Sequence, residues 1–173
     1  TVNKRTVTAT WPNVVSFGYD GNSHEVKATI GNLVNNDSVA FSYTGTITAS
    51  AAGNYTATIS GLTGTKAGNY QLPSNLSQDW SIGTASVILT VDSQVTVVYG
   101  ETATVSYKAS VAGTFTITSN NTSNVTVVAG YTQTVEAGKT YTFTIKGEKA
   151  GSGTIKVKFA PTDSKNYSAP ADK

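Results

Sequence analysis

Apolar and polar residues alternate one by one along most of this chain, and this period of two constrains the fold more than any other feature. Such alternation buries one face of a strand and leaves the other in water, as in antiparallel sheets. Threonine, valine and tyrosine suit a half-buried pleated surface. The clearest runs are Val7–Trp11, Val26–Ile30, Tyr55–Ile59, Val95–Tyr99, Phe115–Ile117, Tyr141–Ile145 and Ile155–Phe159. Helical periodicity is nowhere convincing, so the sequence predicts an all-β fold.

Clusters of turn-forming residues separate these runs. Short strands with turns every 8–12 residues or so indicate antiparallel β-sandwiches or barrels. Glycine, asparagine and aspartate supply most of the turns because they tolerate or stabilise tight backbone corners. The clusters are Asp20-Gly21-Asn22, Asn35-Asn36-Asp37, Ala112-Gly113, Ala137-Gly138-Lys139 and Ala150-Gly151-Ser152-Gly153.

The length of 173 residues suits one large all-β domain or two domains of about 80–90 residues each. One alternating run closes at Trp80 and Ile82, and another opens at Val87. The boundary is therefore expected near Gly83, which divides the chain into residues 1–83 and 84–173. No Pro/Ser-rich spacer lies at this boundary, so we expect an elongated pair of domains with limited hinge motion.

Composition narrows the class of protein. Only 13% of the residues are charged, about half the usual ~25%, so threonine, serine, asparagine and glycine must cover the surface. That surface is common on extracellular β-repeats. The net charge of +2 is too small, and the basic residues too scattered, for nucleic-acid binding. Cysteine is absent, which excludes disulfides and thiolate metal sites.

Methionine is absent as well, so we expect the chain to be an internal piece of a longer protein. No signal-peptide core and no long apolar span occurs in the sequence. Direct insertion into a membrane is therefore not expected.

The motif Ala-Gly-Asn-Tyr occurs twice, at Ala52–Tyr55 and at Ala67–Tyr70, and Lys165-Asn166-Tyr167 is a looser third copy. Glycine accepts positive φ and asparagine tolerates it, so Gly-Asn is expected to form a tight corner. The tyrosine then begins a strand with its ring toward the core, and its hydroxyl can reach a backbone group at the corner. We predict structural tyrosine corners at Tyr55, Tyr70 and Tyr167.

An ordered set of motifs in the first half resembles a known family. The set is Tyr19-Asp20-Gly21, Asn36-Asp37-Ser38-Val39, Ala52-Gly53-Asn54-Tyr55-Thr56, Ile59-Ser60-Gly61-Leu62, Ala67-Gly68-Asn69-Tyr70 and Trp80-Ser81-Ile82. In this order it is similar to the YDG/MBG type of Ig-like repeat in large bacterial surface proteins and adhesins, over roughly residues 5–83. Asn22-Ser23-His24 departs from the threonines more common there.

The second half resembles a generic bacterial Ig-like domain, through "YGETATV" and an ending with Pro161, Asp163 and Tyr167. The resemblance implies two tandem Ig-like β-sandwiches. It also implies an extracellular or cell-surface location in a bacterium, and no catalytic residues.

Catalytic groups are weakly indicated by the residues themselves. His24 is the single histidine and is expected at a strand start, as a surface or edge residue. No G-x-S-x-G nucleophile elbow occurs. Most of the ten carboxylates lie in or beside turns, where they are expected to cap backbone groups. We predict no enzyme, no cofactor and no catalytic site, and a hydrolase stays a distant alternative.

Metal sites and covalent cross-links are also weakly indicated by the residues. Calcium takes oxygen ligands, for which Asn35–Asp37 and Asp163 with Asn166 are conceivable sources. No EF-hand or RTX spacing is present, so no metal site is predicted. A Lys–Asn isopeptide bond requires a core-facing lysine, and neither Lys4 nor Lys108 has an obviously core-facing phase.

Aromatic residues divide between core and surface. Trp11 and Trp80 share faces with apolar neighbours and are expected in the core. Surface recognition is better sought among the nine tyrosines, with Tyr43, Tyr107 and Tyr131 as the candidates.

Two classes of function remain. The first is a non-catalytic stalk, spacer or adhesive segment of a larger bacterial surface or secreted protein, with the neighbouring domains of the same chain as its partners. The alternative is a module that binds glycan, mucin or a host protein, conceivably as an accessory part of a polysaccharide-degrading enzyme.

Overall fold

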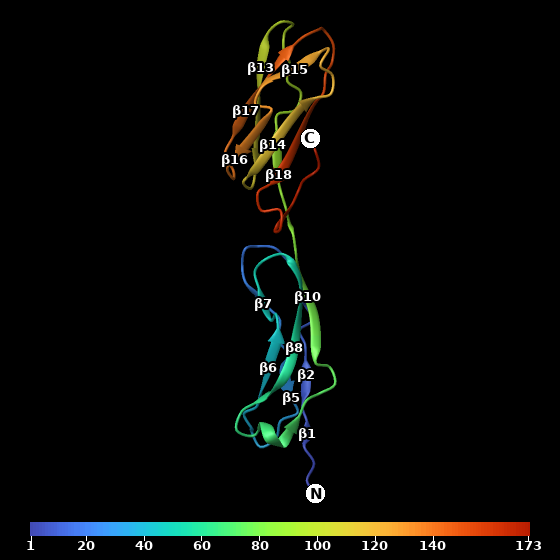
Figure 1. Cartoon of the computed structure of the whole chain (residues 1–173), viewed down its shortest axis with the longest axis vertical. Helices are drawn as coiled ribbons and strands as arrows, with labels where there is room; N and C mark the ends of the chain where they lie inside the picture. The colour runs from blue at the N-terminus through green and yellow to red at the C-terminus, as the bar shows by residue number, and fades with distance from the viewer. The chain divides into compact units, whose positions relative to one another are not determined.

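A computed structural model describes all residues from Thr1 to Lys173. Nearly all of the regular secondary structure of the chain is β-strand, arranged as an all-β sandwich fold (Figure 1). It separates into two compact units, Thr1–Thr84, called unit 1, and Ala85–Lys173, called unit 2. β10 of unit 1 ends at Gly83 and β11 of unit 2 begins at Ala85, so a single residue joins them in sequence.

Unit 1 contains ten strands and one short 3-10 helix. A four-stranded sheet has the order β3-β10-β8-β6, and three two-stranded sheets pair β1 with β9, β2 with β5 and β4 with β7. The elements are β1 (Arg5–Thr6), β2 (Thr8–Thr10), β3 (Ser16–Gly18), β4 (His24–Glu25), β5 (Thr29–Gly31), β6 (Ala40–Gly45), β7 (Thr48–Ala49), β8 (Gly53–Thr63), η1 (Ala67–Asn69), β9 (Tyr70–Gln71) and β10 (Ser77–Gly83).

Two apolar clusters form the core of unit 1. Trp80 and Ile82 of β10 pack with Ala57 of β8 and with Val26, which follows β4. The second cluster gathers Val7, Val39 and Tyr70. The alternating pattern explains the first cluster, because Trp80 and Ile82 lie on the same face of β10.

Unit 2 contains nine strands. One sheet has the order β12-β13-β17-β15, a second has β16-β14-β18, and β11 pairs with β19. The strands are β11 (Ala85–Ser86), β12 (Leu89–Val91), β13 (Thr102–Ala109), β14 (Gly113–Ser119), β15 (Val125–Ala129), β16 (Thr132–Val135), β17 (Tyr141–Gly147), β18 (Ile155–Pro161) and β19 (Tyr167–Ser168).

A single apolar cluster fills unit 2. Phe115 of β14 and Phe159 of β18 come from one sheet, and Tyr107 of β13 and Phe143 of β17 come from the other. Their rings are in contact, with centroids 4.4 Å apart for Tyr107 and Phe115. Each of these strands buries every second residue, as the alternating sequence predicts.

Three local predictions differ from the structure. The run Val26–Ile30 is a strand only at its end, in β5, because residues 26–28 lie between β4 and β5. The run Val95–Tyr99 is not a strand, because its only backbone pairing is an isolated bridge between Tyr99 and Gly147. Val95 and Val97 nevertheless pack against the core of unit 2. A 3-10 helix, η1, also appears where only turns were expected, and it holds the Ala-Gly-Asn of the second Ala-Gly-Asn-Tyr copy.

Candidate functional site

Tyr55 occupies the start of β8, and its hydroxyl donates a hydrogen bond of 2.6 Å to the carbonyl oxygen of Ala51. The ring is half-buried and lies against Trp80, with centroids 4.8 Å apart. The hydroxyl therefore reaches back to a backbone group just before the strand. This geometry supports the predicted corner role of Tyr55.

Tyr70 is more deeply buried, with 3% of its surface exposed. Its hydroxyl accepts a hydrogen bond from the backbone N–H of Val34 at 3.1 Å and donates one to Asp37 Oδ2 at 2.8 Å. Between these partners, Asn35 and Asn36 adopt φ values of 54° and 56°. Tyr70 thus ties down a left-handed turn that is distant in sequence, rather than the corner of its own motif.

The Gly-Asn pairs of the two motifs do not form the corners that were predicted, and that expectation is wrong. Neither Gly53 nor Gly68 has positive φ, since Gly53 begins β8 and Gly68 lies in η1. A Cβ at Gly53 would lie 3.1 Å from the Tyr55 hydroxyl, whereas nothing lies within 4 Å of one at Gly68. The Tyr55 ring therefore lies close over Gly53, whereas Gly68 has open space around it, so identical sequences serve different local structures.

Tyr167 begins β19 and pairs in parallel with Ala85 of β11. Its backbone N–H donates to the carbonyl oxygen of Asp163 at 3.0 Å, and its ring packs against the core of unit 2. Its corner role stays a prediction.

The three candidate recognition tyrosines occupy different environments. Tyr107 is 1% exposed, so its assignment to the surface is wrong: it shares the buried phase of Val105 and Ala109 and donates to Gln133 Oε1 at 2.6 Å. Burial raises the pKa of Tyr107 above the ordinary tyrosine value.

Tyr43 is half-buried, and its hydroxyl donates a hydrogen bond to the carbonyl oxygen of Ala28 at 3.0 Å. Tyr131, at 55% exposure, is openly available on the surface.

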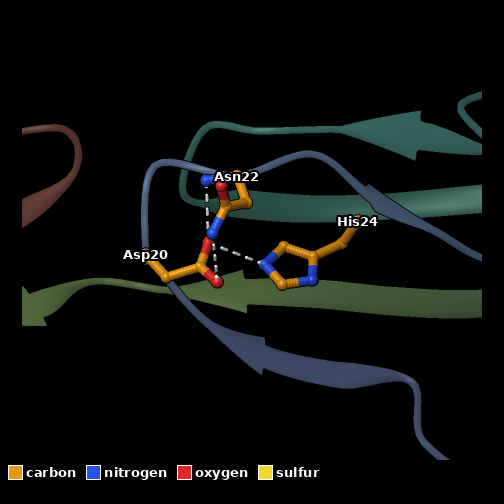
Figure 2. A network of polar contacts seen from close by, with 3 residues as sticks. All are labelled: Asp20, Asn22 and His24. Carbon is orange, nitrogen blue, oxygen red and sulfur yellow. Dashed lines mark hydrogen bonds and ion pairs between the residues drawn. The ribbon is translucent and has the colours of Figure 1, made fainter.

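A small polar network surrounds His24 at the start of β4 (Figure 2). Asp20 Oδ1 accepts the backbone N–H of Asn22 at 2.8 Å and lies 3.1 Å from His24 Nε2. The hydrogen bond from the Asn22 backbone, followed by that from its side chain, lowers the pKa of Asp20 below the ordinary value. The ring of His24 also stacks on Phe17, with centroids 4.4 Å apart. The network fastens the turn between β3 and β4.

The conceivable calcium ligands are engaged in turns. Asp37 accepts the Tyr70 hydroxyl, and Asp163 accepts both the backbone N–H of Asn166, at 3.2 Å, and its side-chain amide, at 2.8 Å. The chain contains no group of three or more His, Asp or Glu side chains placed to hold a metal ion.

Lys4 and Lys108 are exposed, so neither meets the core-facing requirement of an isopeptide bond.

The two tryptophans are packed rather than presented as platforms. Trp80 is 3% exposed, and its indole N–H donates to the carbonyl oxygen of Thr46 at 2.7 Å. Trp11 is half-buried and donates to the carbonyl oxygen of Asn75 at 3.2 Å.

A feature that the sequence did not reveal is a parallel pairing between the first and last parts of each unit. In unit 1, β3 pairs in parallel with β10, with Ser16 opposite Ser81 and Gly18 opposite Gly83. Backbone hydrogen bonds extend this pair on both sides, from Ser81 to Val15 at 2.9 Å and from Tyr19 to Gly83 at 2.8 Å.

Unit 2 repeats this arrangement on a smaller scale. β11, which opens the unit, pairs in parallel with β19 near its end. The backbone N–H of Ala85 donates to the carbonyl oxygen of Asn166 at 2.8 Å, and Ser168 Oγ donates to that of Ala85 at 3.3 Å. Short parallel pairs between distant segments have no local sequence signature, which is why periodicity could not locate them.

Residues 3–77 match the YDG domain family, so the family resemblance of the first half is confirmed. The match supports a structural or adhesive segment of a surface protein. It lies wholly within unit 1, so the Ig-like resemblance of unit 2 stays a prediction.

Among solved structures, the chain is similar to the adhesin InvE of Yersinia pseudotuberculosis, with 16% sequence identity and a TM-score of 0.34. The similarity covers 89% of this chain and 55% of the InvE chain. No curated protein matches the chain in sequence. None of its helices has the length and apolar character needed to cross a membrane.

Proposed function

We propose that this chain is a load-bearing spacer within a larger bacterial surface or secreted protein. The observation that carries the proposal is the parallel pairing of the first and last parts of each unit, β3 with β10 and β11 with β19. The YDG match of unit 1 supports the surface-protein setting.

The physical argument concerns the direction of load. Tension along the chain pulls β3 toward the N-terminus and β10 toward the C-terminus. Because the two strands are parallel, this tension slides one along the other, and their hydrogen bonds carry the load together. In a peeled pair the bonds break one at a time. A sheared pair therefore resists a larger force for the same number of hydrogen bonds.

Hydrogen-bonded sheets and a surface of low charge fit the same role. Threonine, serine and asparagine side chains keep the exposed strand faces in water, and no catalytic group is required for a spacer to act. Its partners are then the neighbouring domains of the same polypeptide.

Single-molecule pulling between the two termini tests the proposal. Ser81→Pro removes the backbone N–H that donates to Val15, and Ala85→Pro removes the one that donates to Asn166. Pulling should give two unfolding events, one for each unit. We expect Ser81→Pro to lower the unfolding force of unit 1 and Ala85→Pro to lower that of unit 2. If neither substitution lowers a force, the parallel pairs are not the load-bearing elements.

A binding role is the second candidate, and the exposed ring of Tyr131 is the observation that favours it. Amphipathic aromatic rings of this kind suit recognition of glycans or proteins. Glycan arrays and mucin-coated surfaces, probed with the chain and with Tyr131→Ala, test this role. Binding that Tyr131→Ala abolishes supports it, and no binding by either protein contradicts it.

A further inference from the structure

A wide cleft of about 1140 Å³ opens between the two sheets of unit 2. Its lining includes β12 and the connection that follows it, and β18 and the connection that precedes it. Apolar side chains, such as Phe143 and Ile145 of β17, share the lining with polar ones, such as Gln94 and Lys149. A ligand suited to this cleft therefore presents apolar and hydrogen-bonding groups together.

Tyr99 lines the cleft, although 73% of its surface is exposed. Its backbone is tied down on both sides of the following glycine. The N–H of Gly100 donates to the carbonyl oxygen of Gly147 at 2.8 Å, and the N–H of Gly147 donates to that of Glu101 at 3.1 Å. An aromatic ring with an apolar face and a polar tip is thus held in place and open to solvent, which suits a ligand with C–H groups beside hydroxyls.

Two polar side chains that have no partner in the chain line the same cleft. Gln94 lies between β12 and β13, and its φ of 61° is unusual for a residue other than glycine. Such backbone conformations cluster at binding sites. Lys149 forms no ion pair, whereas the nearby Lys146 is paired with Glu148 at 3.3 Å. The Gln94 amide donates and accepts, and the Lys149 ammonium donates, so both can bind hydroxyl oxygens.

The mixed lining argues against two simpler classes of ligand. A hydrocarbon chain would take water from the polar groups without replacing their hydrogen bonds. A polyanion requires a concentration of positive charge, whereas Asp92 lines the cleft together with Lys149 and Lys173. A sugar ring combines an apolar C–H face with a rim of hydroxyls, which matches both kinds of lining.

We propose that the cleft of unit 2 binds a neutral oligosaccharide, with one sugar ring stacked on Tyr99 and hydroxyls hydrogen-bonded to Gln94 and Lys149. The cleft is larger than the ~300–1000 Å³ of typical small-molecule pockets, so it takes several sugar units. Tyr131 does not line the cleft. The site is therefore separate from the tyrosine considered above, and it does not depend on the spacer role.

Nuclear magnetic resonance of the isotope-labelled full chain tests the proposal. The probes are neutral hexasaccharides of glucose, mannose, galactose, xylose or N-acetylglucosamine, each compared with its monosaccharide. We expect at least one hexasaccharide to shift the amide signals of Gln94, Tyr99 and Gly151 while the signals of unit 1 stay unchanged. It should bind about tenfold or more tightly than its monosaccharide, because several sugar units make contact.

Three variants locate the binding. Tyr99→Ala should weaken it by about tenfold, since the stacked ring is lost. Gln94→Gly, which still permits the positive φ, should also weaken it. Tyr131→Ala removes a matched exposed tyrosine outside the cleft and should bind like the parent chain. Tyr99→Ala should keep the melting temperature of the parent, because the side chain is exposed.

The proposal is overturned if no hexasaccharide shifts the amides of the cleft. It is also overturned if a hexapeptide of alternating glycine and serine shifts them as strongly, which would assign the cleft to a polypeptide. Binding that Tyr131→Ala abolishes and Tyr99→Ala retains overturns it as well, and places recognition at Tyr131.

Discussion

The hydroxyl of Tyr55 donates a 2.6 Å hydrogen bond to the carbonyl oxygen of Ala51, four residues earlier. To reach it, the ring folds back over Gly53, where a Cβ would lie 3.1 Å from the hydroxyl oxygen. One contact thus explains two residues of the Ala-Gly-Asn-Tyr motif. The tyrosine secures the start of β8, and the glycine leaves room for its ring.

Removing this hydroxyl should weaken unit 1 modestly. Tyr55→Phe is expected to cost about 1 kcal/mol, the net value of one hydrogen bond. Tyr55→Ala should cost about 3 kcal/mol, the lower end for aromatic truncations, because the ring is half-buried. Urea unfolding followed by tryptophan fluorescence measures both effects. Ser50→Ala, which removes an exposed hydroxyl beside the corner, is the control and should change little. Full stability of Tyr55→Ala would refute the structural role.

The two motif glycines should respond differently to alanine. Gly53→Ala is expected to cost about 1 kcal/mol, because the new methyl group crowds a ring held by its hydrogen bond. Gly68→Ala, with open space around it, should instead stabilise by about 0.4–1 kcal/mol.

A double-mutant cycle isolates the cause of the Gly53 effect. In a Tyr55→Ala background, Gly53→Ala should lose its cost, since the crowded ring is gone. A cost that persists in this background would assign the requirement for glycine to something other than the ring.

Tyr70→Phe should be more damaging than Tyr55→Phe. It removes two hydrogen bonds and leaves the Val34 N–H without its acceptor, with an expected cost of about 1–3 kcal/mol. The same urea titration compares the two variants directly. If Tyr70→Phe costs less than Tyr55→Phe, the turn at Val34–Asp37 does not depend on this hydroxyl.

The Asp20 carboxylate should make unit 1 sensitive to acid. Its pKa is lowered in the folded chain, chiefly by the Asn22 backbone hydrogen bond. A lowered folded pKa contributes stability that is present above the unfolded value, about 3.9, and is lost as the pH falls through the folded value. The stability gap between the native chain and Asp20→Asn should therefore be full at about pH 6 and shrink below about pH 4. Urea titrations at about pH 6 and at about pH 3 measure it, and a gap that does not shrink at the lower pH contradicts the assignment.

Alternation predicted the strands well where a partner strand exists. It marked Ile155–Phe159 within β18 and Tyr141–Ile145 within β17. It failed at Val95–Tyr99, where valines pack on the core but the backbone finds only one bridge. The alternation of apolar residues is a local property of the sequence. Strand pairing depends instead on whether the rest of the fold provides a neighbouring strand with free backbone hydrogen-bonding groups.

The site predictions likewise succeed or fail according to whether the feature depends on a local sequence pattern or on the rest of the fold. Tyr107 alternates in phase with Val105 and Ala109, and this pattern is the sequence signal that places it in the core. The backbone at Gly53 and Gly68 could not have been read from sequence, since glycine permits positive φ without requiring it. The parallel pairs β3–β10 and β11–β19 join segments from opposite ends of each unit, and no local pattern encodes them.

The unfolding force of unit 1 in two pulling directions tests the load-bearing claim most directly. The chain has no cysteine, so two introduced thiols define the attachment points unambiguously. Asn13→Cys with Thr84→Cys pulls β3 and β10 from opposite ends and shears them. Ser23→Cys with Thr84→Cys pulls both strands from the same end and peels them. We predict a higher unfolding force in the first direction. An equal or lower force there would contradict the proposal that parallel pairing makes this unit resistant to tension.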